Sequence, residues 1–534
     1  MIQVTLNRPD FEYDIHSLVK AFYPGQEVQV SAGEKVCEES PDLKIRIDYL
    51  EASVRISWEE MPSGQIKSPS FQTEGCDSRR ADEDSDAEAG ASAHSEKDGR
   101  TGSAEYAVDF RDRTEAKNQL KRGLYRVLSE LTGEELPWGT LTGIRPAKIA
   151  MKLLEQGCGR AAVRQYMQDT YGTSGKKAEL ACDIAEREKE LLSNIDYKNG
   201  YSLYIGIPFC PTTCLYCSFP SYPLSMWEGK VDAYLDALER EMDAAAPAFA
   251  HRCPDTVYIG GGTPTTLNPS QLDRVIGKIK ERFDLSCCRE FTVEAGRPDS
   301  ITEEKLAVLR EHGISRISIN PQTMKQETLK LIGRHHTVEQ TVESYRLARR
   351  LGFDNINMDL ILGLPEETIG DVRNTMEQLK KLGPDSLTVH SLALKRASKL
   401  KMFQEDYKNY RLINTQEHME LAAGCAEEMG LFPYYLYRQK SMAGNLENVG
   451  YAKPGKAGMY NVLMMEEKQT ILALGAGAVT KFVFPPDEEA PERSGLMERR
   501  IFRVENVKDI RNYLSRVDEM IRRRKDKMEE ISWH

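Results

Sequence analysis

Three cysteines in one short loop constrain this chain more than any other feature. Cys210, Cys214 and Cys217 lie within eight residues, directly after the apolar run 203–207, which predicts a buried strand. Zinc would complete its tetrahedron with a fourth Cys or His at a short further spacing, and no such residue follows Cys217 before His251. An iron–sulfur cluster is also held by thiolates and normally takes four. With three local thiolates, one iron of a four-iron cluster would keep an open position.

The spacing C-x3-C-x2-C on a loop after a first strand resembles the radical S-adenosylmethionine (SAM) enzymes. In that family the open iron binds the amino and carboxylate groups of SAM, and an electron from the reduced cluster cleaves SAM to a 5′-deoxyadenosyl radical. The resemblance implies a [4Fe–4S] cluster on Cys210, Cys214 and Cys217, with SAM as the second cofactor. A zinc knuckle or a redox dithiol is the alternative for three close thiols taken alone.

Strand and helix patterns alternate six times beyond the turn signal Asn199-Gly200, which predicts βα units around a parallel sheet. The expected strands are 203–207, 256–259, 290–294, 315–319, 355–362 and 386–392. The expected helices between them include 227–246, 269–283, 303–312 and 337–351. Six units fit an open three-quarter barrel, the architecture that the radical SAM resemblance also implies. In such barrels chemistry takes place at the carboxyl ends of the strands.

The predicted fold class is α/β, with three regions along the chain. Residues 1–199 are expected to form an N-terminal α+β domain, 200–394 the open (β/α)6 radical SAM barrel, and 395–534 a C-terminal substrate or cap region. Within the first region, apolar residues recur at helical spacing over 114–131. Residues 62–104 contain almost no large apolar side chains, so they predict a disordered insertion.

Unusual residues follow the predicted strands at the positions where such a barrel would use them. A Gly-rich segment ends the second unit, a Glu the third, a Gln the fourth, and an Asp lies on the fifth. Each alone is most often a turn, an ion pair or a surface group; five successive strand ends in register favour a shared ligand. The resemblance implies that SAM contacts Tyr204, Tyr216, Gly261, Gly262, Thr263, Glu294, Gln322, Arg334 and Asp359.

The run R-I-S-I-N-P-Q at 316–322 is similar to R-I-S-I-G-V-Q of the oxygen-independent coproporphyrinogen oxidases. Within that group, C-L-Y-C-S-F, I-N-P-Q-T and V-H-S-L-A-L-K-R resemble the HemZ-type coproporphyrinogen dehydrogenases, and the likeness covers about residues 204–394. Departures from the oxidase pattern leave the reaction open. Gly206 replaces a His and Phe219 replaces a fourth nearby Cys of the oxidase pattern, and the segment H-N-x-x-Y-W is missing.

The resemblance implies oxidative decarboxylation of coproporphyrinogen III to protoporphyrinogen IX. It also implies a tetrapyrrole substrate and a low-potential electron donor such as a flavodoxin or ferredoxin. A tetra-anionic substrate needs a locally basic pocket. Its candidates are Lys395, Arg396 and Arg438, for which solvated surface charge is the alternative, while Tyr434, Tyr435 and Tyr437 are candidates to face the tetrapyrrole or to pack in the core.

Rival functions are a haem-binding trafficking protein of the same group, radical methylation or ring opening of another tetrapyrrole, and RNA modification. The charge of −11, from 72 Lys and Arg against 83 Asp and Glu, argues against nonspecific nucleic-acid binding.

Eleven cysteines, three of them clustered, do not indicate a disulfide framework. The sequence shows no secretion signal and no apolar run near the roughly 20 residues that span a bilayer. A cytoplasmic location without a membrane span is expected.

Overall fold

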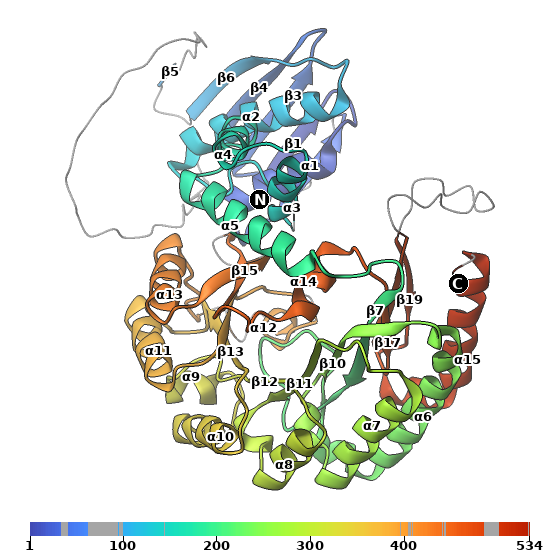
Figure 1. The fold of residues 1–534 in the computed structure, drawn as a ribbon. Coiled ribbons are helices and arrows are strands. Elements are labelled where there is room, and N and C mark those ends of the chain that lie inside the picture. The colour runs from blue at the N-terminus through green and yellow to red at the C-terminus, as the bar shows by residue number, and fades with distance from the viewer. Residues whose placement is uncertain are drawn as a thin grey trace. The chain divides into compact units, whose positions relative to one another are not determined.

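The structure is a computed structural model, and the residues that it describes form two compact units, Met1–Cys182 and Asp183–His534. The described residues are 1–33, 41–61, 94–95, 100–143, 145–395, 397–403, 407, 409–439, 442, 445–484, 501–531 and 533. Figure 1 shows the helices and strands of both units.

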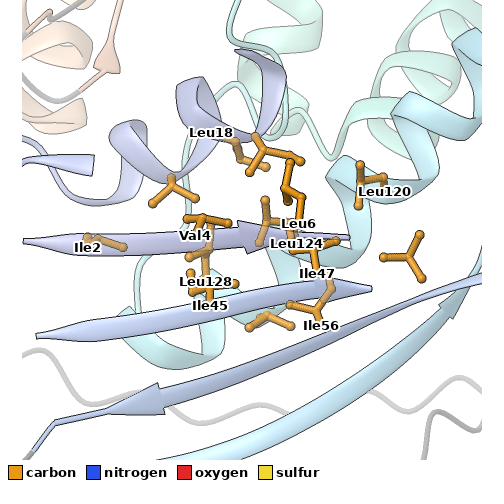
Figure 2. Packing of buried hydrophobic residues seen from close by; sticks show 14 of the residues in the cluster. Ile2, Val4, Leu6, Leu18, Ile45, Ile47, Ile56, Leu120, Leu124 and Leu128 are labelled. Atoms are coloured by element: carbon orange, nitrogen blue, oxygen red, sulfur yellow. The ribbon is translucent and has the colours of Figure 1, made fainter. Parts of the chain in front are cut away.

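A mixed sheet covered by two helices forms the first unit. Its strand order is β2-β1-β3-β4-β6-β5. The strands are β1 (Ile2–Leu6), β2 (Val28–Ala32), β3 (Leu43–Tyr49), β4 (Ser53–Glu60), β5 (His94–Ser95) and β6 (Arg100–Ala107). β1 pairs in parallel with β2 and β3, whereas β3, β4 and β6 pair antiparallel. Figure 2 shows the apolar side chains that α1 (Glu12–Phe22) and α2 (Arg113–Thr132) bury against this sheet.

The helix predicted over 114–131 corresponds to α2. Its start is fixed by Asp112, whose side chain accepts hydrogen bonds from the N–H groups of Thr114 and Glu115, and it ends at Gly133, with φ of 69°. Leu120 and Leu124 of this helix point into the core that Figure 2 shows. The shorter helices α3 (Ala147–Glu155) and α4 (Arg160–Tyr171) and the helix α5 (Gly175–Leu192) follow.

The predicted insertion 62–104 lies mostly outside the described residues, but its last residues belong to β6, which pairs with β4. Composition assigned the first residues of this strand to the insertion because the side chains of β6 are exposed or half-buried along its length. Gly102 allows the ring of Trp58 to cross the strand, since a Cβ there would lie 2.4 Å from Trp58 Cζ2. The strand is therefore part of the sheet, although its low hydrophobicity did not indicate this.

Six parallel strands form the centre of the second unit. Their sheet order is β14-β13-β12-β11-β10-β7. They are β7 (Gly200–Ile207), β10 (Cys253–Gly261), β11 (Glu290–Gly296), β12 (Arg316–Ile319), β13 (Ile356–Leu362) and β14 (Ser386–Ser391). Each coincides with a strand predicted from the sequence. Because neighbouring strands pair in parallel, their carboxyl ends meet at one edge of the sheet.

Helices connect these strands and lie in an arc outside them (Figure 1). They are α6 (Val231–Ala245), α7 (Pro269–Arg282), α8 (Glu303–Glu311), α9 (Gln326–Leu331), α10 (Val338–Arg350) and α11 (Ile369–Leu382). Capping boxes at Asn268, Thr337 and Thr368 fix where α7, α10 and α11 begin. Local sequence therefore sets the helix starts, and the apolar helix faces pack on the sheet.

The residues for which the sequence predicted a cap, 395–534, extend the sheet at both ends. β16 (Asn448–Ala452) pairs antiparallel with β14 and with β15 (Phe432–Tyr437) beyond it. β17 (Ile471–Leu474) pairs in parallel with β7 and is followed outward by β18 (Val479–Val483) and β19 (Ile501–Glu505). In the described chain the edge strands β15 and β19 are not neighbours, so the sheet of eleven strands is open. The predicted open α/β barrel is confirmed, with five further strands.

The helix α15 (Ile510–Glu530) packs against α6 around the buried carboxylate of Glu241. This carboxylate accepts hydrogen bonds from Asn506 Nδ2 at 2.8 Å and from Tyr513 Oη at 2.7 Å, and it pairs with Arg524. It also accepts the N–H of Gly475 at 2.9 Å, directly after β17. One buried acid therefore fastens the last helix and the loop after β17 to the barrel.

The boundary predicted at Asn199-Gly200 falls inside the second unit, which begins at Asp183. Leu192 and Ile195 are buried in a cluster with Val462 and Leu463 of α14 (Met459–Glu466). The turn signal is real, since the N–H of Gly200 donates to the carbonyl of Asp196 at 2.8 Å. A turn signal locates the start of a strand, but the packing of apolar side chains decides which unit a segment joins.

Candidate cluster and cofactor site

A cavity of about 600 Å³ lies at the carboxyl ends of the parallel strands. Its wall contains every residue that the sequence assigned to the cluster or to SAM: Cys210, Cys214, Cys217, Tyr204, Tyr216, Gly261, Gly262, Thr263, Glu294, Gln322, Arg334 and Asp359. These residues come from several strands and the residues close after them, from the loop between β8 (Phe209–Cys210) and β9 (Tyr222–Pro223), and from the segment after α9. The fold brings them together, and their contacts with a bound cofactor stay a prediction.

The cysteine loop, residues 208–223, is held at its base and at its middle. At the base, β8 (Phe209–Cys210) pairs with β9 (Tyr222–Pro223) in a small parallel ladder. At the middle, the N–H of Leu215 donates to the carbonyl of Ile332 at 2.9 Å. Backbone hydrogen bonds therefore hold the loop at two places without any metal ligand.

All three cysteines of the loop line the cavity. Thr263 Oγ1 donates to Cys210 Sγ at 3.5 Å, and Ser221 Oγ donates to Cys217 Sγ at 3.8 Å. Burial raises the pKa of Cys210 to about 12 and also raises that of Cys217, so a metal must displace their protons to bind. Within the described part of the chain, no three Cys, His, Asp or Glu side chains converge on one point as ligands of a single ion would.

The Gly-rich segment after β10 packs against the chain that enters the cysteine loop. The N–H of Gly262 donates to the carbonyl of Ile207 at 2.7 Å, and that of Thr263 to the carbonyl of Phe209 at 2.7 Å. A Cβ on Gly262 would lie 2.5 Å from the carbonyl oxygen of Phe209. The sequence suggested glycine here for close approach to a ligand; at Gly262 the close neighbour is the protein's own backbone.

Glu294, in β11, is held by a tyrosine of the neighbouring strand. Tyr258 donates its hydroxyl to Glu294 Oε1. Burial raises the pKa of Glu294 to about 7; the hydrogen bond from Tyr258 acts against this rise, and Asp359 adds to it. The ring of Tyr258 packs on those of Tyr204 and Tyr460, with centroids 6.2 and 4.4 Å away. A carboxyl group that titrates near neutral pH therefore lies in the cavity wall.

The backbone turns sharply at Gln322, after β12. Its φ of 69° lies in the left-handed region, which is uncommon for a residue other than glycine. The N–H of Gln322 donates to the carbonyl of Asp359 at 2.9 Å, and its own carbonyl accepts from Ile361 at 3.0 Å. These two bonds to β13 hold the strained conformation at a wall position of the cavity.

Several buried polar atoms in this wall have no hydrogen-bond partner among the described residues. They are Ser318 Oγ, Asn320 Oδ1, Gln322 Oε1, Arg334 Nε and Tyr460 Oη. An unsatisfied buried polar group costs roughly 1–3 kcal/mol, so such groups are uncommon in folded proteins. Unpartnered donors and acceptors suit a polar ligand with an amino group, a carboxylate and a ribose. Together with the three thiols, they fit a cluster that carries SAM.

A histidine that the sequence did not assign joins two wall residues. His390 of β14 lies with its Nε2 4.0 Å from Asp359 Oδ2 and with its Nδ1 3.2 Å from Tyr437 Oη. Burial lowers the pKa of His390, and Asp359 partly offsets that change. The arrangement places a largely neutral imidazole between a carboxylate and a phenol in the same cavity.

The candidates for a basic pocket have different positions. Lys395 lines the cavity, and its Nζ lies 5.7 Å from the centre of the Phe219 ring. Arg438 is buried and is not a wall residue; it donates to the carbonyl of Asn445 at 2.7 Å. Arg396 lies outside the described residues.

Of the aromatic candidates, Tyr435 and Tyr437 line the cavity, whereas Tyr434 packs in the cluster around α14.

Sequence reasoning missed Arg297, Tyr258, Tyr460 and His390, which also line the cavity. Arg297 follows the Glu-Ala-Gly segment at the end of β11, and His390 lies in the strand predicted over 386–392. Their position at strand ends was a usable signal. Tyr460 gave none, because it reaches the cavity from α14, a helix far along the chain.

The model of the radical SAM superfamily matches residues 204–379. Over 373 residues, the chain is 44% identical to the oxygen-independent coproporphyrinogen-III oxidase-like protein HemZ of Bacillus subtilis, covering 69% of this chain and 74% of HemZ. The chain belongs to the HemZ family of radical SAM proteins. This membership confirms the predicted family and enzyme class, a radical SAM oxidoreductase, and implies an iron–sulfur cluster and SAM.

Two other relatives match shorter parts of this radical SAM protein. The heme chaperone HemW of Bacillus subtilis is 39% identical over 195 residues, 36% of this chain and 50% of HemW. The oxygen-independent coproporphyrinogen III oxidase of Escherichia coli is 36% identical over 192 residues, 36% of this chain and 42% of that protein. The chain therefore spans half or less of these two relatives.

None of the described helices is both long enough and apolar enough to cross a membrane.

Proposed function

We propose that this chain catalyses the oxidative decarboxylation of coproporphyrinogen III, which converts propionate side chains to the vinyl groups of protoporphyrinogen IX. The observation that carries the proposal is one cavity that joins three cysteine thiols to unpartnered polar groups, in a chain 44% identical to HemZ. The name of that relative supplies the substrate class. A cytoplasmic setting is part of the proposal.

Cys210, Cys214 and Cys217 would hold a four-iron cluster and leave one iron for SAM. When bound together, these cofactors supply the radical chemistry that removes a hydrogen atom from the β-carbon of a propionate. Loss of carbon dioxide, together with transfer of one electron from the substrate to a separate one-electron acceptor, would then leave the vinyl group. The electrons that the cycle consumes would come from a low-potential donor such as a flavodoxin or ferredoxin.

The wall residues would bind and orient SAM. Glu294 can accept hydrogen bonds from SAM once it is ionised, which its pKa of about 7 permits at neutral pH. Arg334, with an unpartnered Nε, can donate to a carboxylate. The rings of Tyr204, Tyr258 and Tyr460 pack on one another and would shield the bound cofactor from water on this side of the cavity. Each role uses a group that the fold already holds in place.

The substrate end of the cavity would be the region around Lys395, His390 and Tyr437. Lys395 is half-buried; burial lowers its pKa, and the nearby Cys217 opposes that shift. A propionate carboxylate beside this ammonium group would be attracted by its charge. Tyr435 and Tyr437 stack with centroids 6.2 Å apart and offer flat apolar surface to a pyrrole ring.

The test is an anaerobic assay of the reconstituted, chemically reduced protein with SAM and coproporphyrinogen III, with products identified by mass spectrometry. We expect the loss of one carbon dioxide per vinyl group and cleavage of SAM. A Cys214→Ala variant is the matched negative control. Cleavage of SAM without any vinyl product would contradict the proposed reaction.

A second candidate function is haem trafficking, which the 39% identity to a heme chaperone favours. The same cavity would then bind haem. Stable binding of haem by the purified protein, together with SAM cleavage that porphyrinogen does not stimulate, would support this function. Porphyrinogen-dependent vinyl formation without retained haem would exclude it.

A further inference from the structure

A second buried arginine lies beside the cysteine loop. Arg297 follows the last residue of β11, and only 2% of its side chain is exposed. Its Nε and Nη2 donate to the two carboxylate oxygens of Asp299 at 2.9 and 2.6 Å. A bidentate pair of this kind fixes the plane of the guanidinium group. The orientation of its third nitrogen is therefore set by the fold.

That third nitrogen faces the cysteine loop. Arg297 Nη1 donates to the carbonyl and to the Oγ1 of Thr212, at 3.1 and 2.6 Å, and lies 4.0 Å from Cys214 Sγ. Thr212 Oγ1 donates in turn to the carbonyl of Gly333 at 2.8 Å. Arg297 thus joins the end of β11 to the part of the loop that separates two of the predicted cluster ligands.

The charges in this arrangement have opposite expected effects on a cluster. Asp299 binds the guanidinium edge away from Cys214, so the positive group is interposed between the carboxylate and the sulfur. A cation beside a sulfur ligand stabilises the reduced, more negative cluster, and an anion destabilises it. The low effective dielectric of a buried site strengthens both of these electrostatic effects.

We propose that Arg297 is a positioning residue for the cysteine loop and that its charge raises the reduction potential of the cluster bound there. This inference rests on the cluster of the proposed function. It assigns Arg297 a task that differs from the SAM contact expected of Arg334, which also lies near Cys214. An easier reduction of the cluster is the consequence for catalysis, because the cycle starts from the reduced state.

The experiment is an anaerobic redox titration of the full-length reconstituted protein without SAM, followed by electron paramagnetic resonance, with iron and sulfide content measured on the same samples. The variants are Arg297→Gln, Arg297→Lys and Asp299→Asn. Arg274→Gln is the matched control, because Arg274 of α7 forms ion pairs with Asp236 and Glu239 of the neighbouring helix α6, away from the cavity.

We expect a more negative midpoint potential for Arg297→Gln, a smaller negative shift for Arg297→Lys, a positive shift for Asp299→Asn and no shift for the control. If Arg297→Gln assembles no cluster, the positioning role is supported, and the other two variants test the charge. Unchanged potentials, or shifts of the same sign for Arg297→Gln and Asp299→Asn, would overturn the proposal. An unsubstituted chain that assembles no cluster would instead refute the proposed function itself.

Discussion

The two sheets of the molecule bury their strands in different ways. In the first unit, β1 and β3 alternate buried residues with more exposed ones, and the buried face packs beneath α1 and α2 (Figure 2). In the second unit, β12 and β17 are buried along their whole length. A strand covered on one face contributes only to a core. A strand covered on both faces also directs side chains into the barrel interior, where a ligand can bind.

Buried polar side chains in the barrel are of two kinds. Near the strand starts they satisfy each other: Thr256 Oγ1 donates to Ser202 Oγ at 2.9 Å, and Arg316 donates to Ser386 Oγ at 2.8 Å. Beyond the carboxyl end of β12, Gln322 Oε1 has no partner within the described chain. Buried polarity alone therefore does not mark a site. What distinguishes the cavity is that several unpartnered polar atoms gather in one wall.

The largest expected effect is the loss of a cluster ligand. Cys214→Ala should abolish both the bound iron and the cleavage of SAM, because two thiolates cannot hold a four-iron cluster that needs three from this loop. Iron and sulfide analysis of the anaerobically reconstituted variant measures this. Cys425→Ala, outside the cavity, is the control and should keep full iron content. Full iron content in Cys214→Ala would break the assignment of the site.

A substitution in the core of the first unit should lower the free energy of unfolding and leave the iron content of the protein unchanged. Leu124 is fully buried, and Leu124→Ala should cost about 2–5 kcal/mol of unfolding free energy through the cavity it leaves. Urea unfolding followed by circular dichroism measures the cost. Leu131→Ala, at a partly buried position of the same helix, should cost less. Loss of iron in proportion to the lost stability would show that the two regions are not separable in this way.

Glu294 should make the stability of the cofactor-free barrel depend on pH. Its folded pKa of about 7 lies above its ordinary value of 4.5. The neutral form is therefore favoured in the fold, and stability falls as pH rises from 4.5 through about 7. Glu294→Gln removes this loss, so it should stabilise the protein at pH 8 by about 3 kcal/mol and have little effect at pH 4.5.

Thermal unfolding of the cofactor-free protein and of Glu294→Gln at both pH values measures this difference. Glu239→Gln, at a surface ion pair of α6, provides a matched control. An equal effect of Glu294→Gln at both pH values would show that the carboxyl group is not shifted.

The smallest expected effect concerns the hydrogen bond that Tyr258 donates to Glu294. Tyr258→Phe removes a bond that lowers the pKa of Glu294, so ionisation should move to higher pH, by a free energy of about 1 kcal/mol. The pH midpoint of SAM binding, measured by calorimetry, should rise. Tyr345→Phe, outside the cavity, should leave the midpoint unchanged. A lowered midpoint would contradict the direction of this hydrogen bond's effect.

The sequence predicted the six central strands because each is a short apolar run between turn signals, followed by a helix. It also predicted residues that line one cavity, the three cysteines from their spacing and the others from the family resemblance; their contacts with a cofactor stay a prediction. It did not predict β17, because four apolar residues give no sign that they pair with β7, which lies far earlier in the chain.

The remaining site residues were missed for the same physical reason. Arg297 donates a hydrogen bond to Thr212, and the ring of Tyr460, in α14, packs on that of Tyr258. Both contacts join segments that are distant in the sequence, so only the folded structure shows them. The fold also explains why residue 262 is a glycine, because a side chain there would collide with the carbonyl of Phe209. Spacing within one loop can be seen in a sequence, whereas contacts between distant segments cannot.

The most direct test of the central claim, an iron–sulfur cluster with one open iron on Cys210, Cys214 and Cys217, is electron paramagnetic resonance of the reduced, anaerobically prepared protein before and after SAM is added. We predict the signal of a reduced four-iron cluster and a clear change in that signal with SAM. Bound zinc in place of iron, or a cluster signal that SAM leaves unchanged, would contradict the account.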